Sequence, residues 1–149
     1  MVKIRKAKLE DSVDIVDFQL KMALETEDLK LDKKILEDGV KAVFQDPSKG
    51  IYYIIESNQE IAGSMLTTFE WSDWRNGMVI WFQSVYILPE FRGKKLFSNL
   101  YQFFEDMVNN REDLRGIRLY VDKTNQHAQK VYQKVGMSKE HYEMYEWLK

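Results

Sequence analysis

One run of the chain, residues 79 to 100, limits the fold more than any other part of the sequence. It begins with apolar, β-branched and aromatic residues, which favour a strand. Pro89 then ends any strand ladder, because proline has no backbone N–H. From Leu96 onward, apolar residues recur at steps of three and four, which is helical spacing. The run therefore predicts a strand at residues 79–88, a turn, and then a helix.

The turn inside this run, Arg92-Gly93-Lys94-Lys95, is the first candidate site. The first turn of a helix offers unpaired N–H groups and partial positive charge, and anions bind there. With basic side chains beside it, the turn suits a phosphate group. A turn whose lysines are simply solvated is an equally good interpretation of the spacing alone.

The remaining predicted elements alternate between helices and strands, with hairpin turns in the middle of the chain. We expect a strand at residues 3–5, helices at 12–25 and 32–44, strands at 51–56 and 61–69, a strand at 117–121, a helix at 126–135, and two short strands or a hairpin in the tail at 138–148. This order predicts a single α/β domain over residues 1–149, with a mixed central sheet flanked by helices.

The composition excludes several classes of function. A formal net charge of −2 argues against bulk affinity for nucleic acid. The absence of cysteine removes disulfides and thiolate nucleophiles. No signal peptide or long apolar run is visible, so we expect a cytoplasmic protein with no membrane partner. His127 and His141 share no metal-ligand spacing, so we expect no metal site.

A second candidate site lies on the helix predicted at 126–135. Asn125 and Tyr132 are seven residues apart and therefore share one face of a helix. Ala128 between them leaves room for a ligand against that face. From these residues alone, a capping Asn and a half-buried Tyr are the better interpretation.

Two motifs resemble those of the GNAT superfamily of acyl-CoA-dependent N-acetyltransferases. Val85-x-x-x-Pro89-x-x-Arg92-Gly93-Lys94-x-Leu96 resembles motif A, a loop that holds the coenzyme A pyrophosphate on backbone amides. Asn125-x-x-Ala128-x-x-x-Tyr132-x-x-x-Gly136 resembles motif B. Lys95 and Phe97 stand where the family usually has a glycine and a small residue. We expect Lys95 to fit with a negative φ and the Phe97 ring to join the core. The resemblance covers almost the whole chain and implies the GNAT fold, with a mostly antiparallel sheet.

The resemblance implies an N-acetyltransferase that moves the acetyl group of acetyl-CoA to a primary amine by direct transfer in a ternary complex. Tyr132 would protonate the departing thiolate. The pantetheine arm would lie along residues 83–87 and the pyrophosphate on the amides of 92–97. The implied cofactor-binding residues are Val85, Tyr86, Ile87, Arg92, Gly93, Lys94, Lys95, Leu96, Phe97 and Asn125.

The acceptor side carries weaker signals. Strand 79–88 holds no carboxylate, so the base that many members of the resembling family carry there is missing. Glu25 and Glu27 end the first helix, where that family places the acceptor entrance. Trp71 and Trp74 flank a loop, and aromatic rings can stack on a cation. These four residues are the implied binding site for a small-molecule or peptide amine. The family often forms homodimers, which the resemblance leaves open for this chain.

Two alternatives compete with the enzyme. A coenzyme A-binding or regulatory module that has lost catalysis is favoured by the missing strand Glu and by Lys95 in place of a glycine. A nucleic-acid or protein-interaction domain could use the basic turn at 92–95, but the net negative charge counts against it.

Overall fold

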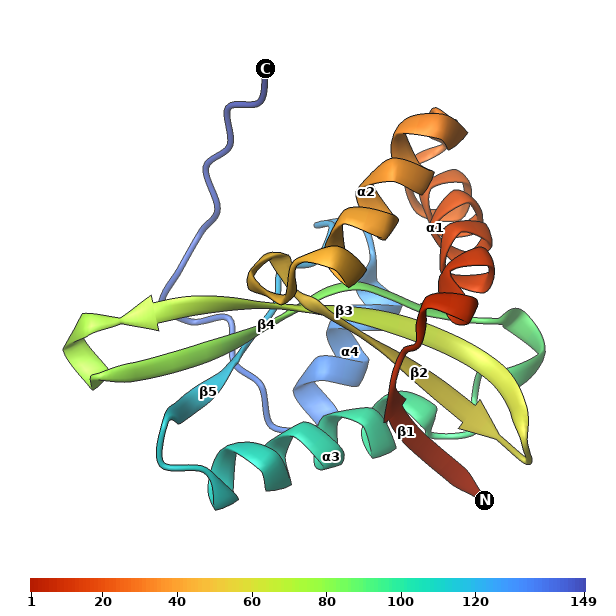
Figure 1. Cartoon of the computed structure of the whole chain (residues 1–149). Coiled ribbons are helices and arrows are strands. Elements are labelled where there is room, and N and C mark those ends of the chain that lie inside the picture. The colour runs from red at the N-terminus through yellow and green to blue at the C-terminus, as the bar shows by residue number, and fades with distance from the viewer.

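A five-stranded sheet with helices on both faces forms the body of the protein, in a computed structural model that describes all 149 residues (Figure 1). The strands are β1 (Val2–Lys6), β2 (Ile51–Ser57), β3 (Glu60–Ser72), β4 (Gly77–Ile87) and β5 (Leu114–Arg118). The helices are α1 (Ser12–Glu27), α2 (Lys33–Gln45), α3 (Leu96–Asn110) and α4 (Gln126–Lys134). None of the helices combines the length and the hydropathy that a membrane span requires.

The sheet has the strand order β1-β2-β3-β4-β5. Neighbours pair antiparallel except β4 and β5, which are parallel and are connected through α3. Asn58 and Gln59 both have positive φ, at 53° and 72°, and so form the tight turn that suits the twist of a β2–β3 hairpin. The predicted mixed, mostly antiparallel α/β sheet is therefore confirmed.

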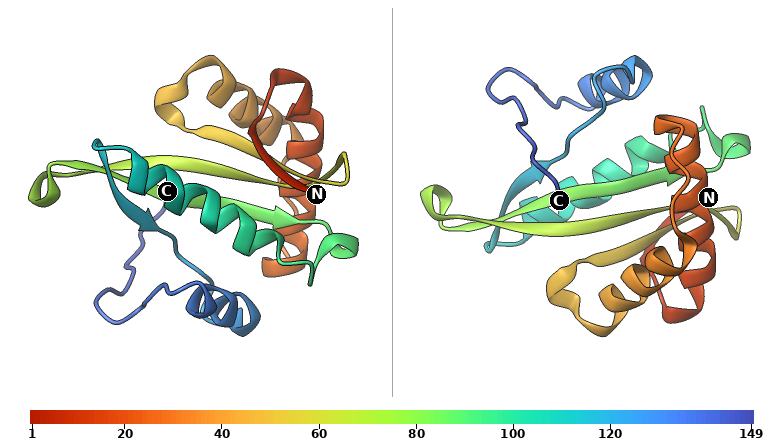
Figure 2. Two further views of the ribbon diagram at one scale, coloured as in Figure 1. Left: turned by 90° about the horizontal axis from the view of Figure 1, so that it is seen from below. Right: turned by 90° about the horizontal axis from the view of Figure 1, so that it is seen from above.

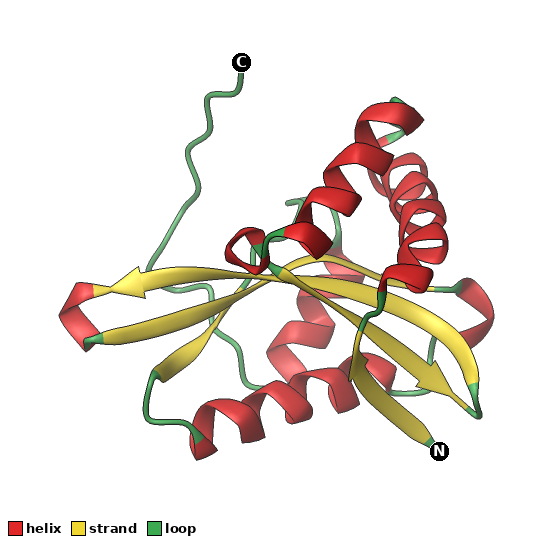
Figure 3. Ribbon diagram, in the orientation of Figure 1, coloured by secondary structure: helices red, strands yellow, loops and turns green.

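Two apolar clusters hold the helices on the sheet, one on each face (Figure 3). Side chains alternate along β2, so Tyr52 and Ile54 pack against α1 and α2 while Tyr53 packs against α3. Phe104 of α3 is the largest fully buried side chain and contacts the rings of Tyr53 and Phe82. The larger cluster also carries α4 through partly buried residues such as Val131.

Two predicted regions of strand differ from the observed fold. The strand predicted at 117–121 is wrong in its bounds: β5 pairs with β4 from Leu114 to Arg118, and the chain then leaves the sheet toward α4 (Figure 2). The strands predicted in the tail are absent, because residues 138–149 have no neighbouring strand to pair with and remain exposed. The alternating pattern of the tail is real, but a pattern forms a strand only beside a partner.

A β-bulge interrupts β4 where the functional site begins. Gln83 pairs with Leu66 and Tyr86 with Ser64, so two residues of β4 face one residue of β3. Ser84 adopts a φ of +50°, as bulged residues can. Next to the bulge, β3 approaches so closely that a methyl group on Gly63 would lie 2.2 Å from the carbonyl oxygen of Tyr86.

We predict that Gly63→Ala destabilises the protein by about 1–3 kcal/mol, because the added methyl forces β3 and β4 apart. Gly116→Ala in β5 is the matched control, since a methyl group there meets nothing within 4 Å. Urea unfolding measures both. Equal stabilities of the two variants would show that the β3–β4 contact is looser than described.

Candidate functional site

The first component of the site is an opening between β4 and β5. The two strands pair only from Met78 to Trp81 of β4, opposite Leu114 to Arg118 of β5. Beyond that point, residues 83–87 have β3 on one side and no strand on the other. Unpaired backbone groups along one edge of a strand form a ready template for an extended ligand. The opening runs toward the start of α3.

The second component is the start of α3. No side chain caps its first turn, so these backbone N–H groups are free to meet an anion. Lys95 is the N-cap residue and has a φ of +60°, in the left-handed region that favours glycine. The negative φ predicted for Lys95 is therefore wrong. Gly93 also has a positive φ, of 76°, and Lys94 lies with its Nζ 5.0 Å from the centre of the Phe91 ring.

Arg92, Glu25 and Tyr86 form a hydrogen-bonded cluster beside this turn. The Arg92 Nη2 donates to Glu25 Oε2 at 2.7 Å, and the Tyr86 hydroxyl donates to Glu25 Oε1 at 2.7 Å. The Arg92 Nε also donates to the carbonyl oxygen of Ile87 at 2.8 Å, and its guanidinium lies 5.4 Å from the centre of the Tyr86 ring. The sequence assigned Glu25 to the acceptor and Arg92 to the cofactor, whereas the structure joins them.

The cluster shifts the acidity of its members. Burial and the hydrogen bond to Glu25 raise the pKa of Tyr86 to about 12, so this phenol stays protonated. Burial works to raise the pKa of Glu25, but the hydrogen bonds from Tyr86 and Arg92 outweigh it and hold that pKa below its ordinary value. Glu25 is therefore an ionised anchor for Arg92 with both oxygens engaged.

The third component is α4. Asn125 accepts a hydrogen bond from the backbone N–H of Ala128 at 3.1 Å, which makes it the N-cap of this helix. Tyr132 packs on Phe97, with ring centres 5.1 Å apart, and burial raises its pKa. The expectation that Phe97 joins the core is confirmed, since this side chain is buried in the main cluster. Phe97 thus connects the start of α3 to the face of α4 that carries Tyr132.

The other three predicted acceptor residues lie apart from this cluster. Trp71 and Trp74 sit at the far end of the β3–β4 hairpin, where Trp71 pairs with Met78. The eight steps of β4 from Met78 to Tyr86 span about 26 Å. Trp74 is 88% exposed. Glu27 is the last residue of α1 and is exposed.

A set of side chains outside the predicted site lies on the sheet face that carries α1 and α2. Strand pairing places Thr68 opposite Trp81, and Trp81 opposite Arg118. Arg118 forms an ion pair with Glu70, Gln83 donates to the Thr68 hydroxyl at 3.3 Å, and Trp81 lies 6.3 Å from the Tyr120 ring. We call these residues the Glu70 patch: Thr68, Glu70, Trp81, Gln83, Arg118 and Tyr120. The patch lies where β4 and β5 separate.

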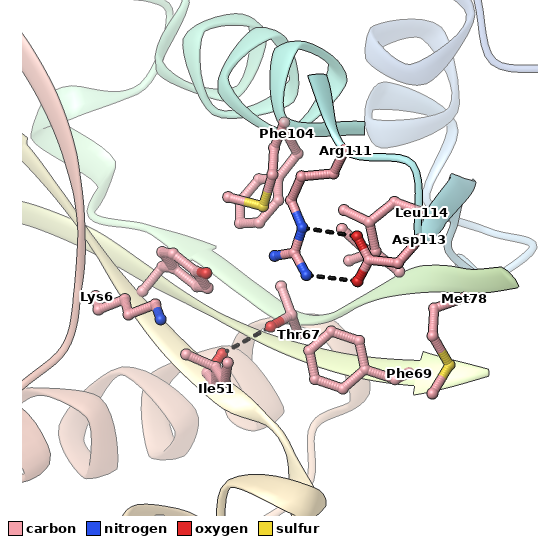
Figure 4. A pocket seen from close by; sticks show the side chains of 12 residues that line it. Lys6, Ile51, Thr67, Phe69, Met78, Phe104, Arg111, Asp113 and Leu114 are labelled. Carbon is pink, nitrogen blue, oxygen red and sulfur yellow. Dashed lines mark hydrogen bonds and ion pairs between the residues drawn. The ribbon is translucent and has the colours of Figure 1, made fainter. Parts of the chain in front are cut away.

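A separate cavity of about 340 Å³ lies between α3 and the sheet (Figure 4). Most of its lining is apolar, including Phe69, Phe104 and Leu114. Its one carboxylate belongs to Asp113, which accepts two hydrogen bonds from Arg111 at 3.0 and 2.6 Å. None of the predicted site residues lines this cavity, so we place the candidate site at the β4–β5 opening. No group of three or more His, Cys, Asp or Glu side chains is arranged to hold a metal ion.

Sequence comparison identifies the class of protein that this fold and site define. A family model described as the acetyltransferase (GNAT) family matches residues 15–137. The chain therefore belongs to the GNAT acetyltransferase family. No curated protein sequence matched it.

Solved structures agree with the family assignment. A possible acetyltransferase from Clostridium difficile 630 is 37% identical, with a TM-score of 0.90, over 99% of this chain and 97% of that chain. Two structures of lower identity share the fold. A predicted acetyltransferase with acetyl-CoA from Clostridium acetobutylicum is 20% identical, with a TM-score of 0.72 over 100% of this chain and 95% of that one. Glucosamine-6-phosphate N-acetyltransferase from Arabidopsis thaliana is 18% identical, with a TM-score of 0.72 over 100% and 99%.

We predict that Lys95→Gly raises the free energy of unfolding by about 0.5–1 kcal/mol. Glycine relieves the left-handed backbone of Lys95, and this gain exceeds the entropy that glycine adds to the unfolded chain. Lys94→Gly is the matched control, because Lys94 has no positive φ to relieve and should lose stability. Urea unfolding at neutral pH measures both. A loss of stability in Lys95→Gly would mean that the lysine side chain stabilises this turn.

We predict that protonation of Glu25 at acidic pH lowers the free energy of unfolding. Because its pKa is lower in the folded chain than the ordinary 4.5, its contribution is present above pH 4.5 and is lost as the pH falls below that value. Glu25→Gln should therefore flatten the fall in stability between about pH 5 and pH 3. Glu27→Gln, which removes a carboxylate from the same helix end, should leave the fall in place. Identical profiles of stability against pH for wild type and Glu25→Gln would contradict the prediction that hydrogen bonds from Tyr86 and Arg92 lower the pKa of Glu25.

Proposed function

We propose that the protein is an N-acetyltransferase that moves the acetyl group of acetyl-CoA to a primary amine by direct transfer in a ternary complex. The observation that carries the proposal is the opening beside residues 83–87, which leads to the uncapped start of α3 at Lys95. An extended thioester arm that ends in a pyrophosphate matches this pair of features. Membership of the GNAT family supports the same co-substrate.

The residues at the opening fit acetyl-CoA chemically. The free edge of Val85 to Ile87 supplies backbone hydrogen bonds for the amides of a pantetheine arm, apart from the Ile87 carbonyl oxygen, which already accepts a hydrogen bond from Arg92. The amides of 92–97 and the charges of Arg92, Lys94 and Lys95 suit a pyrophosphate. Lys95 has the left-handed backbone that glycine adopts more readily than other residues, and glycine is what the family usually has at this position. The backbone of the family's loop is thus kept, which supports the fit. In our proposal, Asn125 contacts the co-substrate with the part of its amide that does not cap α4.

The proposed reaction needs one proton removed and one proton supplied. The neutral form of the amine forms a bond from its nitrogen to the acetyl carbonyl carbon, the carbon–sulfur bond breaks, and the nitrogen gives its proton to solvent water. We assign protonation of the departing thiolate to Tyr132. A phenol is protonated at neutral pH at its ordinary pKa of about 10, and burial raises the pKa of Tyr132 further, so the hydroxyl carries the proton that it donates. With no cysteine in the chain, a thioester intermediate on the enzyme is excluded.

For the amine, we propose an approach from the sheet face that carries α1. An amine is cationic at neutral pH, so carboxylates and aromatic rings favour its binding. Glu25 and Glu27 lie near the end of α1, and the Glu70 patch adds a carboxylate paired with Arg118 and the rings of Trp81 and Tyr120. Because both oxygens of Glu25 are engaged, we propose that Glu27 and Glu70 contribute more to holding the amine. We also propose that Trp71 and Trp74 contact a large acceptor.

A coenzyme A-binding module without catalysis is the second candidate. It is favoured by the lack of any carboxylate on β4 and by a lysine in the left-handed position. Such a module would bind acetyl-CoA without releasing free coenzyme A in the presence of any amine.

We predict that acetyl-CoA at a hundred times its dissociation constant stabilises the protein by about 2.7 kcal/mol, and that an amine panel contains an acceptor that releases free coenzyme A. Tyr132→Phe should lower the rate of release by about 10²- to 10⁴-fold and leave acetyl-CoA affinity unchanged. Tyr101→Phe on α3 is the matched control, since it removes another partly buried hydroxyl. Stabilisation without release for any amine supports the non-catalytic module, and no stabilisation at millimolar acetyl-CoA contradicts both proposals.

A further inference from the structure

The cavity between α3 and the sheet plays no part in the proposed function. It lies on the sheet face opposite the Glu70 patch, and Met107, which lines it, is about 17 Å along α3 from Leu96. The floor of the cavity is fully buried, since Thr67, Ile80 and Phe104 are only 1–2% exposed. Protein cores are close-packed and hold few hollows larger than a water molecule. A cavity of about 340 Å³ at the end of the core is therefore a candidate binding site.

The apolar lining of the cavity suits a small aromatic ligand. Its aromatic side chains are Tyr53, Phe69 and Phe104, and the thioethers of Met78 and Met107 lie beside them. Aromatic rings contact one another favourably at their edges, and methionine sulfur also contacts rings and adapts to their shape. A cavity of about 150 Å³ holds one benzene ring, so this one has room for a ring with a short side chain.

The charged groups of the lining favour an anion. Figure 4 shows Lys6 and Arg111 on opposite sides of the cavity. Arg111 donates from Nε and Nη2 to both oxygens of Asp113, and its Nη1 has no partner in the chain. Lys6 takes part in none of the ion pairs of the chain. Two cations and one carboxylate give the lining a net charge of +1.

A buried hydroxyl adds a further donor to the cavity. Tyr53 is 4% exposed, and its hydroxyl has no hydrogen-bond partner in the chain. Burial raises the pKa of Tyr53, and the positive charge of Arg111 acts against this rise, so the two groups are close enough to interact. Buried polar side chains are hydrogen-bonded as a rule. A carboxylate beside Arg111 would accept the hydrogen bond that Tyr53 has to offer.

We propose that this cavity binds a small arylalkanoic acid, with its ring between α3 and the sheet and its carboxylate between Lys6 and Arg111. The Tyr53 hydroxyl donates a hydrogen bond to the same carboxylate. None of the residues from 83 to 97, which form the proposed acetyl-CoA site, lines the cavity. The acid therefore binds whether or not acetyl-CoA is bound, and the inference stands apart from the proposed function.

The first test measures binding by isothermal titration calorimetry on the full chain. The probe is 3-phenylpropanoate, and 3-phenylpropan-1-ol is its uncharged counterpart. We expect saturable binding of the acid at millimolar concentration and about five- to tenfold weaker binding of the alcohol, because the charge-assisted hydrogen bonds are lost. Absence of binding by the acid, or equal affinities for the two compounds, would overturn the proposal.

The second test removes one cation from the cavity. Lys6→Met keeps the apolar stem, and it should weaken binding of the acid about five- to tenfold and leave the affinity for the alcohol unchanged. Lys3→Met is the matched control, since it removes the same charge from the same strand outside the cavity. This variant should bind both compounds as the wild type does. An equal loss in the two variants would mean that only the net charge of the protein matters, which contradicts the proposed site.

The third test locates the acid by the methyl resonances of the methionines. The probe 3-phenylpropanoate should shift the resonances of Met78 and Met107, which line the cavity, and leave those of Met22 and Met137 in place. Met107→Trp, which fills the cavity with an indole ring, should abolish binding of both compounds, and the unchanged resonance of Met22 would show that the variant is folded. Shifts at Met22 or Met137 without shifts at Met78 and Met107 would place the acid elsewhere and overturn the proposal.

Discussion

The site depends on one feature of the sheet: β4 has a partner on both sides for only part of its length. Up to Trp81, β4 is an ordinary central strand. Past Trp81, the bulge at Ser84 turns β4 while β5 ends, and the backbone between them is left unpaired. Such unpaired groups are costly when buried and useful when a ligand can satisfy them. The fold therefore leaves a line of unpaired backbone N–H and C=O groups that ends at the start of α3.

The hydrogen-bonded cluster of Glu25, Tyr86 and Arg92 joins two parts of the molecule that are far apart in sequence. Glu25 lies in the last turn of α1, while Tyr86 and Arg92 lie on either side of the chain's exit from β4 toward α3. Tyr86 is buried and packs against Phe18 of α1, with ring centres 5.7 Å apart. The end of α1 is therefore fixed to the end of β4 and the turn before α3 by an ion pair, a hydrogen bond and an aromatic contact together.

Sequence patterns predicted the elements well where a local rule decides them and less well where a partner decides them. The helix from Leu96 and the hairpin turn at Asn58-Gln59 follow from spacing and turn chemistry. Strict alternation would place Tyr86 on the opposite face from Gln83, and only the bulge brings both to the α1 face. The contact of Tyr86 with Glu25, and the Glu70 patch, therefore could not be foreseen without the strand register. The tail shows the same limit, because its strand pattern has no partner within one copy.

The ion pair between Glu25 and Arg92 gives the anion site that we propose at this turn a built-in competitor. Because the carboxylate is tethered to the same molecule, its effective concentration at the guanidinium is far above that of any free ion. A lone inorganic anion has to displace this carboxylate and gains little in return. A ligand that also reaches the amides at the start of α3 gains several contacts for the same displacement. In the proposed function, the pair would therefore act as a selectivity filter, which discriminates against small cellular anions in favour of a longer molecule that spans the turn.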